Sequence, residues 1–293
     1  MTIGSISEIG YLSLRTTDLA GSIRNAVEVL GISEVESTAK KAALSAQAKS
    51  QEIVYTQAAE DAVDHIGMVA ASTDDLEAIR EKVDRGNYAI LSEGSIETGV
   101  GNGFAFIGPG GYTWQVYTEQ ADYSLIKRGE VGPDRFGHIN VQTPDTVGMR
   151  DFLVDVFDLR VSDQIGADAG FFLRANNEHH AVAILKSPVV KLHHHAWETQ
   201  SLIDLGRLAD RLARRGSRLL WGPVRHGAGD NIAVYYEEPS GAIIELYTDM
   251  EHIFDDDRPA RIWEETDPWW LNQWDGQVPP NAMDFGIPPV ERS

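Results

Sequence analysis

An internal duplication constrains the fold of this chain more than any other feature of its sequence. Three segments of the first half align, in order, with three segments of the second half. The aligned pairs begin at Ile9 and Phe136, at His65 and His194, and at Phe104 and Val234. The offsets between the copies are 127, 129 and 130 residues. Three matches in one order at nearly constant offset indicate two tandem modules with a shared architecture.

Each copy predicts the same succession of elements. IGYLSLRTTDLAGSIRNAVEVLGI and FGHINVQTPDTVGMRDFLVDVFDL both indicate an alternating strand and then an amphipathic helix, which Asp18 and Asp145 can cap. The second pair indicates a strand and a helix that ends at a glycine in the C′ position, Gly86 or Gly216. In the third pair, Pro-Gly or Pro-Ser-Gly joins two strands as a hairpin.

The duplication divides the chain into three parts. We predict an N-terminal module at residues 1–126 and a C-terminal module at residues 127–250, with the copies themselves at roughly 6–122 and 132–252. A tail rich in tryptophan and proline follows at residues 251–293, and its prolines favour an extended chain over a helix. This tail either packs on a module or on a neighbouring subunit, or it forms a lid over the active site.

Composition and charge exclude several classes of function. The net charge is -20 and no basic patch is visible, which argues against binding of nucleic acid or of an anionic membrane surface. No apolar run approaches the ~20 residues that cross a bilayer, and the N-terminus lacks a secretory signal, so a cytoplasmic protein is expected. Because there are no cysteines, a metal site must use His, Asp or Glu.

The two copies differ at three aligned strand positions. The first copy has Tyr11, His65 and Gln115 where the second has His138, His194 and Glu245. The second set can form a complete site of two histidines and one carboxylate, which leaves coordination positions open for substrate and oxygen. In the first set, tyrosine and neutral glutamine are poor partners for a lone histidine. This asymmetry predicts a metal site in the second module alone.

Each of these residues also has a purely structural interpretation. A lone histidine on a strand, such as His138, is more often a satisfied core residue, and residues 193–195 could form a merely polar stretch. On an alternating strand, however, His194 is expected to point opposite to both of its neighbours. Glu245 stands in an apolar strand, where a carboxylate is costly to bury unless a cation pairs with it. Together with the duplication, these features favour a metal site.

Four motifs of the second half carry a family resemblance. They are FGHINVQTPD, NNEHHAVAIL, LHHHAWE and YYEEPSGAIIELY. At these residues the sequence resembles the vicinal oxygen chelate superfamily and, within it, the two-domain extradiol dioxygenases. The resemblance implies an α+β fold of four βαβββ units, two per module, each module curling its sheet into an incomplete β-barrel. It also implies Fe(II), with Mn(II) as an alternative, and O2 as a co-substrate.

The same resemblance implies roles for residues around the metal. His180 matches a second-sphere acid/base histidine, and His226 matches a histidine that hydrogen-bonds the bound catechol or oxygen. Tyr235 matches a tyrosine in contact with the substrate hydroxylate, and Phe172 matches a wall of the ring pocket. Each also has a structural alternative: a histidine exposed on an edge strand or loop, or an ordinary core aromatic. Phe171, Phe172, Trp197 and the tail tryptophans suggest room for an aromatic or alkyl substituent.

The implied activity is extradiol ring cleavage in aromatic catabolism. Both atoms of O2 enter a small aromatic vicinal diol of the catechol type, and a ring-opened semialdehyde results. Relatives of this size usually assemble, so a homo-oligomer is expected. Three alternatives stay open: another metal-dependent enzyme of the superfamily, such as an isomerase or epimerase; a non-catalytic binding protein; and a ring-cleaving enzyme of secondary metabolism.

Overall fold

Four βαβββ units follow one another along the chain. The computed structural model describes residues 4–122 and 132–292. The first unit contains β1 (Ile6–Thr16), α1 (Leu19–Asn25), η1 (Ala26–Leu30), β2 (Ser33–Ser37), β3 (Lys41–Ser45) and β4 (Ile53–Gln57). The second contains β5 (Ala62–Ala70), α2 (Thr73–Arg85), β6 (Ala89–Ser92), β7 (Gly103–Ile107), η2 (Pro109–Gly111) and β8 (Thr113–Tyr117).

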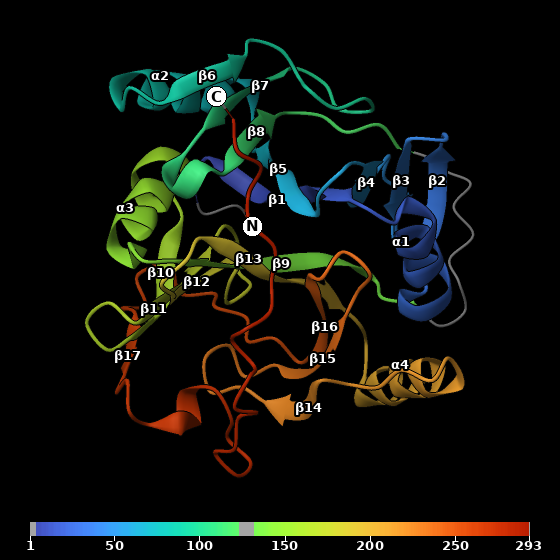
Figure 1. The fold of residues 1–293 in the computed structure, drawn as a ribbon. Helices are drawn as coiled ribbons and strands as arrows, with labels where there is room; N and C mark the ends of the chain where they lie inside the picture. Colours follow the sequence, from blue (N-terminus) through green and yellow to red (C-terminus); the bar gives the residue numbers. More distant parts are fainter. Residues whose placement is uncertain (1–3, 123–131, 293) are drawn as a thin grey trace.

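The second half repeats this plan and then adds the tail. The third unit contains β9 (Arg135–Thr143), α3 (Thr146–Phe157), β10 (Arg160–Ile165), β11 (Gly170–Arg174) and β12 (Val182–Lys186). The fourth contains β13 (Lys191–Glu198), α4 (Leu202–Arg214), β14 (Trp221–Arg225), β15 (Ile232–Glu237) and β16 (Ile243–Thr248). The tail contributes β17 (Arg261–Trp263) and η3 (Pro268–Trp270). The predicted α+β class and its four βαβββ units are confirmed (Figure 1).

Each module has one sheet, built from two units side by side. The strand orders are β2-β3-β4-β1-β5-β8-β7-β6 and β14-β15-β16-β13-β9-β12-β11-β10-β17. The first strands of the two units pair antiparallel at the centre, β1 with β5 and β9 with β13. Each of these strands also pairs in parallel with the last strand of its own unit. The centre of the second sheet therefore brings β9, β13 and β16 together.

Helix capping follows the sequence signals, with one exception. The side chains of Asp18 and Asp145 accept hydrogen bonds from the third residue beyond them, as predicted. Gly216 has a φ of 71° after α4, as expected of a C′ glycine. The same prediction for Gly86 is wrong: its φ is -76°, and Asn87 takes the left-handed conformation with a φ of 53°. Asparagine tolerates this region better than most residues, so it can replace glycine there.

The two modules share one hydrophobic core. Phe152 of α3 packs against Trp114 of β8, with ring centroids 5.7 Å apart. Polar contacts cross the same boundary: the hydroxyl of Tyr55 donates to Oε2 of Glu238 at 2.6 Å. The second module thus rests on the first through buried contacts of both kinds.

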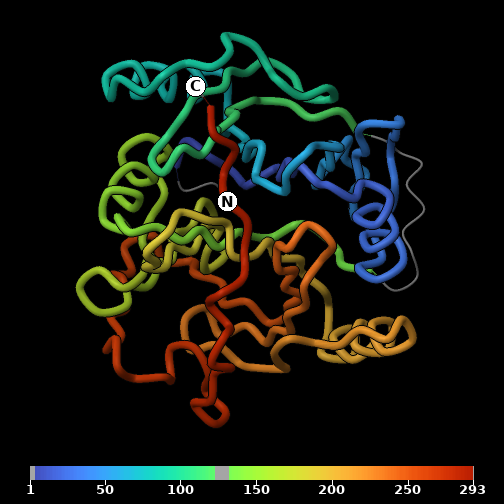
Figure 2. The backbone as a smooth tube through the Cα atoms, viewed as in Figure 1, coloured from blue at the N-terminus to red at the C-terminus, as the bar shows by residue number. Residues whose placement is uncertain are grey.

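The tail runs across the second module and ends on the first (Figure 2). β17 pairs in parallel with β10, and Ile287 exchanges two backbone hydrogen bonds with Leu192 of β13. Val290 then donates to the carbonyl of Val63. The tail is mostly extended, as its prolines predict. In the described parts of the chain, no helix is long and apolar enough to cross a membrane.

Candidate active site

His138, His194 and Glu245 lie together on the three central strands of the second sheet. Nε2 of His194 lies 3.1 Å from Oε2 of Glu245, and Nε2 of His138 lies 3.3 Å from the same oxygen. The register explains this convergence, because Ala196 of β13 pairs with His138 on one side and with Glu245 on the other. One donor atom from each of the three residues falls within 4.8 Å of the others. All three side chains are buried.

The ionisation of these groups suits a divalent cation. Burial alone would raise the pKa of Glu245, but the neighbouring His138 and His226 lower it below its usual range. Burial, and then the adjacent histidines, hold the pKa of His194 well below its usual value. A carboxylate and neutral imidazoles are the protonation states that metal ligands need. The donor set therefore fits Fe(II) or Mn(II).

A hydrogen bond from His193 to the tail fixes which ring nitrogen of His194 faces the candidate metal position. Nε2 of His193 donates to the carbonyl oxygen of Ala282, 2.6 Å away in the tail. Its Nδ1 must then accept, and it lies 2.8 Å from Nδ1 of His194. His194 therefore carries its proton on Nδ1 and presents the lone pair of Nε2 to the metal position. Such an outer partner commonly sets the tautomer of a ligating histidine.

The side chains of His193 and His194 both face the cavity, contrary to the prediction from strand alternation. The pairing of β9 with β13 shifts register between Leu192 and His194, which breaks the alternation at this point. Only His195 points away, with its Nε2 3.4 Å from Oε1 of Glu238. His193 is therefore a site residue that periodicity alone could not identify.

His180 is buried beside the metal position. Its ring centroid lies 4.2 Å from that of His138 and 5.1 Å from that of Phe172. The alternative of an exposed edge-strand histidine is therefore excluded. Burial, and then the neighbouring histidines, lower the pKa of His180 well below its usual value. The ring is consequently neutral at pH 7 and able to accept a proton.

A buried chain of contacts extends from His180 away from the cavity. Nδ1 of His180 lies 3.0 Å from Nδ1 of His179, whose Nε2 lies 3.1 Å from Oδ1 of Asp163. The carboxylate favours a proton on Nε2 of His179, so Nδ1 of His179 accepts one from His180. His180 then keeps the lone pair of Nε2 free. Asp163 also accepts hydrogen bonds from Trp263 and Arg258 of the tail, at 2.6 and 3.1 Å.

His226 and Tyr235 form a hydrogen-bonded pair on the opposite wall. Nδ1 of His226 donates to the carbonyl oxygen of Leu271 at 2.6 Å, so its Nε2 accepts from the hydroxyl of Tyr235, also at 2.6 Å. His226 is buried, which excludes the alternative of an exposed loop histidine. Burial, and then the charge of Glu245, raise the pKa of Tyr235 well above its usual value. The hydroxyl therefore stays protonated and can donate.

Two asparagines of the site escaped the sequence analysis. Nδ2 of Asn231 donates to Oε1 of Glu245 at 3.0 Å and so orients the carboxylate. Asn140 lines the same cavity and lies two residues after His138 on β9, a spacing that puts both on one face. That spacing could have indicated Asn140. Asn231 stands five residues after His226, in the segment GPVRHGAGDN, but only the fold reveals its contact.

The cavity above these residues has a volume of about 790 Å³, part of it open to solvent. Phe172 lines it as predicted from the resemblance, together with Trp270 of the tail. Phe171 and Trp197 do not: both are fully buried in the main core, so they cannot shape room for a substituent. Tail residues from Pro279 to Phe285 form part of the rim, which is compatible with the lid interpretation.

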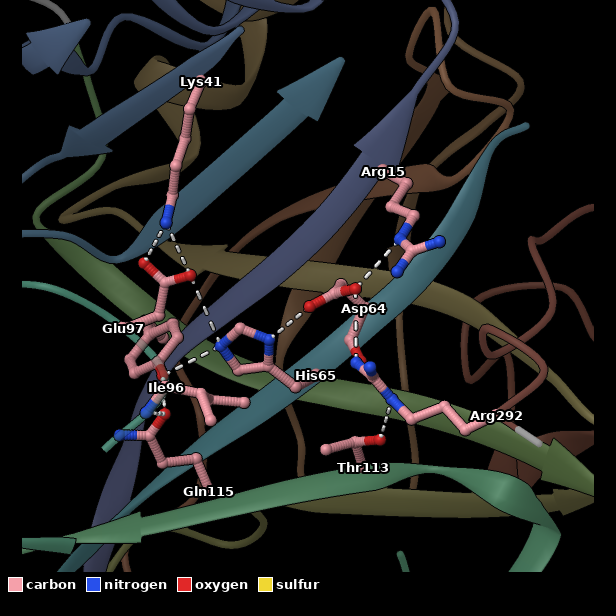
Figure 3. A network of polar contacts seen from close by, with 10 residues as sticks. Arg15, Lys41, Asp64, His65, Ile96, Glu97, Thr113, Gln115 and Arg292 are labelled. Atoms are coloured by element: carbon pink, nitrogen blue, oxygen red, sulfur yellow. Dashed lines mark hydrogen bonds and ion pairs between the residues drawn. The ribbon is translucent and has the colours of Figure 1, made fainter. Parts of the chain in front are cut away.

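The corresponding position of the first module is closed by hydrogen bonds. The hydroxyl of Tyr11 donates to Oε1 of Gln115 at 2.9 Å and lies 3.0 Å from Nε2 of His65. Nδ1 of His65 lies 2.7 Å from Asp64, and its Nε2 lies 3.7 Å from Glu97 (Figure 3). The three aligned side chains are thus joined through Tyr11, whereas their counterparts in the second module converge on one position.

Comparison with known proteins agrees with this geometry. Residues 135–246 match the family model of the Glyoxalase/Bleomycin resistance protein/Dioxygenase superfamily, which is the vicinal oxygen chelate superfamily. This part of the second module is therefore similar to that superfamily. The matched range contains all three candidate ligands. The first module lies outside it, in keeping with the weaker resemblance there.

Two curated relatives of the chain are metapyrocatechases. The chain is 26% identical to a metapyrocatechase of Geobacillus stearothermophilus over 319 residues, which cover 98% of this chain and 95% of the relative. It is 31% identical to metapyrocatechase 2 of Cupriavidus necator over 147 residues, half of this chain and 43% of that protein. The first of these alignments includes both modules and most of the tail.

Solved structures share the whole fold. The homoprotocatechuate 2,3-dioxygenase of Brevibacterium fuscum, in complex with 3,4-dihydroxyphenylacetate, superposes with a TM-score of 0.90 at 22% identity, covering 99% of this chain and 97% of that chain. A Mn(II)-bound glyoxalase of Novosphingobium aromaticivorans gives a TM-score of 0.87 at 29% identity, covering 99% and 96%. The two-module architecture with its tail is therefore common to all three proteins.

Proposed function

We propose that this protein is an extradiol dioxygenase, which inserts both atoms of O2 into a catechol-type vicinal diol and yields a ring-opened semialdehyde. The observation that carries the proposal is the convergence of His138, His194 and Glu245 under a cavity that also contains His180 and Tyr235. Two histidines and one carboxylate leave open coordination positions for a chelating diol and for oxygen. The relatives that are ring-cleaving dioxygenases by name support the same reaction.

The side chains around the ligands have separate tasks in this proposal. A bound Fe(II) or Mn(II) ion would supply the Lewis acidity that lowers the pKa of a substrate hydroxyl, and the electron transfer that O2 requires. His180 accepts the proton of that hydroxyl at Nε2 and later returns it, as a general base and general acid. Its Nδ1 is held by His179, which keeps the ring in the required tautomer.

Tyr235 and His226 serve the opposite side of the ring. When substrate is present, the hydroxyl of Tyr235 turns its one proton from Nε2 of His226, 2.6 Å away, toward a ring oxygen. Phe172 packs against the ring plane beside His180. The tail excludes water from this side, because Leu271 and Trp270 line the cavity.

A glyoxalase-type isomerase is the second candidate, because one structural relative carries that name at 29% identity. The observations here favour the dioxygenase. Isomerases of the superfamily that the sequence resembles draw ligands from both paired modules, whereas Tyr11 and Gln115 close the corresponding position of the first module. An isomerase also consumes no oxygen, so the two candidates differ in a measurable quantity.

The test measures oxygen consumption by protein reconstituted with Fe(II) and, separately, with Mn(II). Catechol, 3-methylcatechol and 2,3-dihydroxybiphenyl are added in air, and a yellow ring-fission product with stoichiometric oxygen uptake is expected. Absence of uptake with every diol, at full metal occupancy, would reject the proposal. Conversion of a 2-oxoaldehyde thiol adduct without oxygen uptake would favour the isomerase.

We further propose that the protein works in the cytoplasm as a homo-oligomer. The support is the resemblance to assembling relatives and an open sheet edge at β17, where Ile262 is 70% exposed. Light scattering after size-exclusion chromatography would give the mass of the particle in solution. A mass of one chain at micromolar concentration would reject the oligomer.

A further inference from the structure

We propose that the substrate of this site is a neutral diol with an apolar substituent, and that diols bearing a carboxylate are rejected. This inference rests on the proposed ring cleavage and makes it more specific. It follows from what lines the cavity beyond the ligand atoms, and from where the nearby cations point.

Much of the cavity lining outside the candidate ligands is apolar, with Asn140, Asn231 and Asn281 as its amide exceptions. Residues of three separate parts of the chain contribute: Leu185 from β12, Leu220 and Trp221 around the start of β14, and Met283 and Phe285 from the tail. The cavity encloses about 790 Å³ of space, part of which is open to solvent. It therefore has room for a substituent on the ring of the substrate, and that substituent would contact apolar side chains.

No lysine or arginine lines this cavity in the part of the chain that the structure describes. Lys191 lies at its margin, but its Nζ donates to the carbonyl oxygen of Met283 at 2.7 Å. Arg225 adjoins His226, yet its guanidinium contacts Asp230 and Asp249 at 3.2 and 3.1 Å. The nearby cations are therefore already bonded elsewhere.

Two of the polar groups of the wall are also committed. Nε2 of His193 is bonded to the carbonyl of Ala282, and Nδ1 of His226 to that of Leu271. A carboxylate on the substrate would lose its hydration and find no counter-charge, which is strongly unfavourable in an apolar site. The net charge of -20 adds long-range repulsion of anions. A neutral methyl, alkyl or aryl group meets neither penalty.

The experiment compares two sets of diols on the same Fe(II)-loaded protein. The neutral set is 3-methylcatechol, 4-methylcatechol and 2,3-dihydroxybiphenyl, and the anionic set is 3,4-dihydroxyphenylacetate and 2,3-dihydroxybenzoate. We expect kcat/KM from oxygen uptake to favour the best neutral diol by at least about 10²-fold. Anaerobic titration followed by tryptophan fluorescence should give the same order in Kd, independently of turnover.

A substitution in the cavity wall tests whether the wall itself causes the preference for neutral diols. Leu185→Arg puts a guanidinium on the cavity wall and should shrink the preference for neutral diols at least ~10-fold. Leu220→Arg serves the same purpose from a half-buried position if the first variant does not fold. Leu185→Met controls for shape, and Ile203→Arg adds the same charge at a position of α4 that is 67% exposed. Both controls should retain the wild-type preference.

The outcomes separate this inference from the proposed function. If no diol is cleaved, the proposed function fails and the inference falls with it. If 3,4-dihydroxyphenylacetate is cleaved as well as the neutral diols or better, ring cleavage stands and the neutral-substrate inference is overturned. Unchanged preferences in folded Leu185→Arg and Leu220→Arg would equally overturn it, because the wall would then not determine selection by charge.

Discussion

The hydroxyl of Tyr235 lies 2.6 Å from Nε2 of His226, while Tyr236, the next residue, points into the boundary between the modules. The strand β15 thus has one tyrosine in the cavity and one in the core. Tyr236 is fully buried there and donates to Oδ1 of Asn25 at 3.1 Å. This pair of neighbours provides a matched comparison between a role in the reaction and a role in stability.

Tyr235→Phe should retain metal and lose turnover. The variant removes one hydrogen bond to an ionising group, which is worth roughly 1.5–3 kcal/mol, or about 10–10²-fold in kcat. Tyr236→Phe should keep kcat and lower the free energy of unfolding by about 1 kcal/mol. Steady-state kinetics and chemical denaturation measure both. Equal turnover in the two variants would remove Tyr235 from the reaction.

Glu245→Gln should abolish metal binding with little change in shape. The substitution places in the second module the residue that the first module has at Gln115, and it removes the buried negative charge that faces the ion. Because loss of an outer partner alone costs ~10–10²-fold in metal affinity, loss of a ligand should cost at least about 10²-fold. Metal analysis after dialysis checks this, with exposed Glu237→Gln as the control. Full occupancy in Glu245→Gln would contradict the assignment.

His180→Phe should keep metal and substrate binding but lower turnover by ~10²–10⁴-fold, the usual cost of losing a general acid/base. Single-turnover kinetics under saturating diol separates this loss from weaker binding. His252→Phe is the control, since His252 is exposed and outside the cavity. Wild-type kcat in His180→Phe would show that another group moves the proton.

The stability of the metal-free protein should fall as the pH drops below about 6.5. Burial is the first cause that lowers the pKa values of four histidines of the site, namely His180, His193, His194 and His226. Below 6.5 the unfolded chain binds protons that the folded chain does not, so stability rises with pH in this window.

Each of these histidines contributes a slope of up to about 1.4 kcal/mol per pH unit. Urea unfolding between pH 5 and 8 measures the slope of the unfolding free energy against pH. His180→Phe removes one of the four titrating histidines, so it should reduce that slope by the contribution of one proton. Glu245, whose pKa is lowered, acts separately, because its contribution is lost only below about pH 4.5. A flat profile from pH 8 to 5 would be incompatible with neutral buried histidines.

Asp163→Asn should loosen the tail and lower turnover together. Asp163 is 1% exposed and contacts His179, Arg258 and Trp263, so its loss leaves buried partners unsatisfied at a cost of about 3 kcal/mol. Limited proteolysis of the tail and kcat are the two measurements. Asp168→Asn, which breaks the exposed pair with Lys186, should cost less than about 1 kcal/mol. A resistant tail with reduced kcat would limit the role of Asp163 to His179.

The sequence alone determined the repeated architecture and the three candidate ligands. The elements follow from local signals: periodicity of 2 and 3.6 residues, capping aspartates and hairpin turns. The ligands follow from comparing Tyr11 with His138 and Gln115 with Glu245, which needs only the alignment of the two copies. The family resemblance then supplied the fold of four units and the choice of His180, His226 and Tyr235. These inferences depend on residues close in sequence or on copies of known offset.

Only the tertiary structure decided which other side chains reach the site. A register shift turned His193 into the cavity, Asn231 reached Glu245, and the tail brought Leu271 to His226. Trp197 was directed into the core instead. Pairing register and the path of an extended tail arise from contacts between residues far apart in sequence, and no local pattern encodes them.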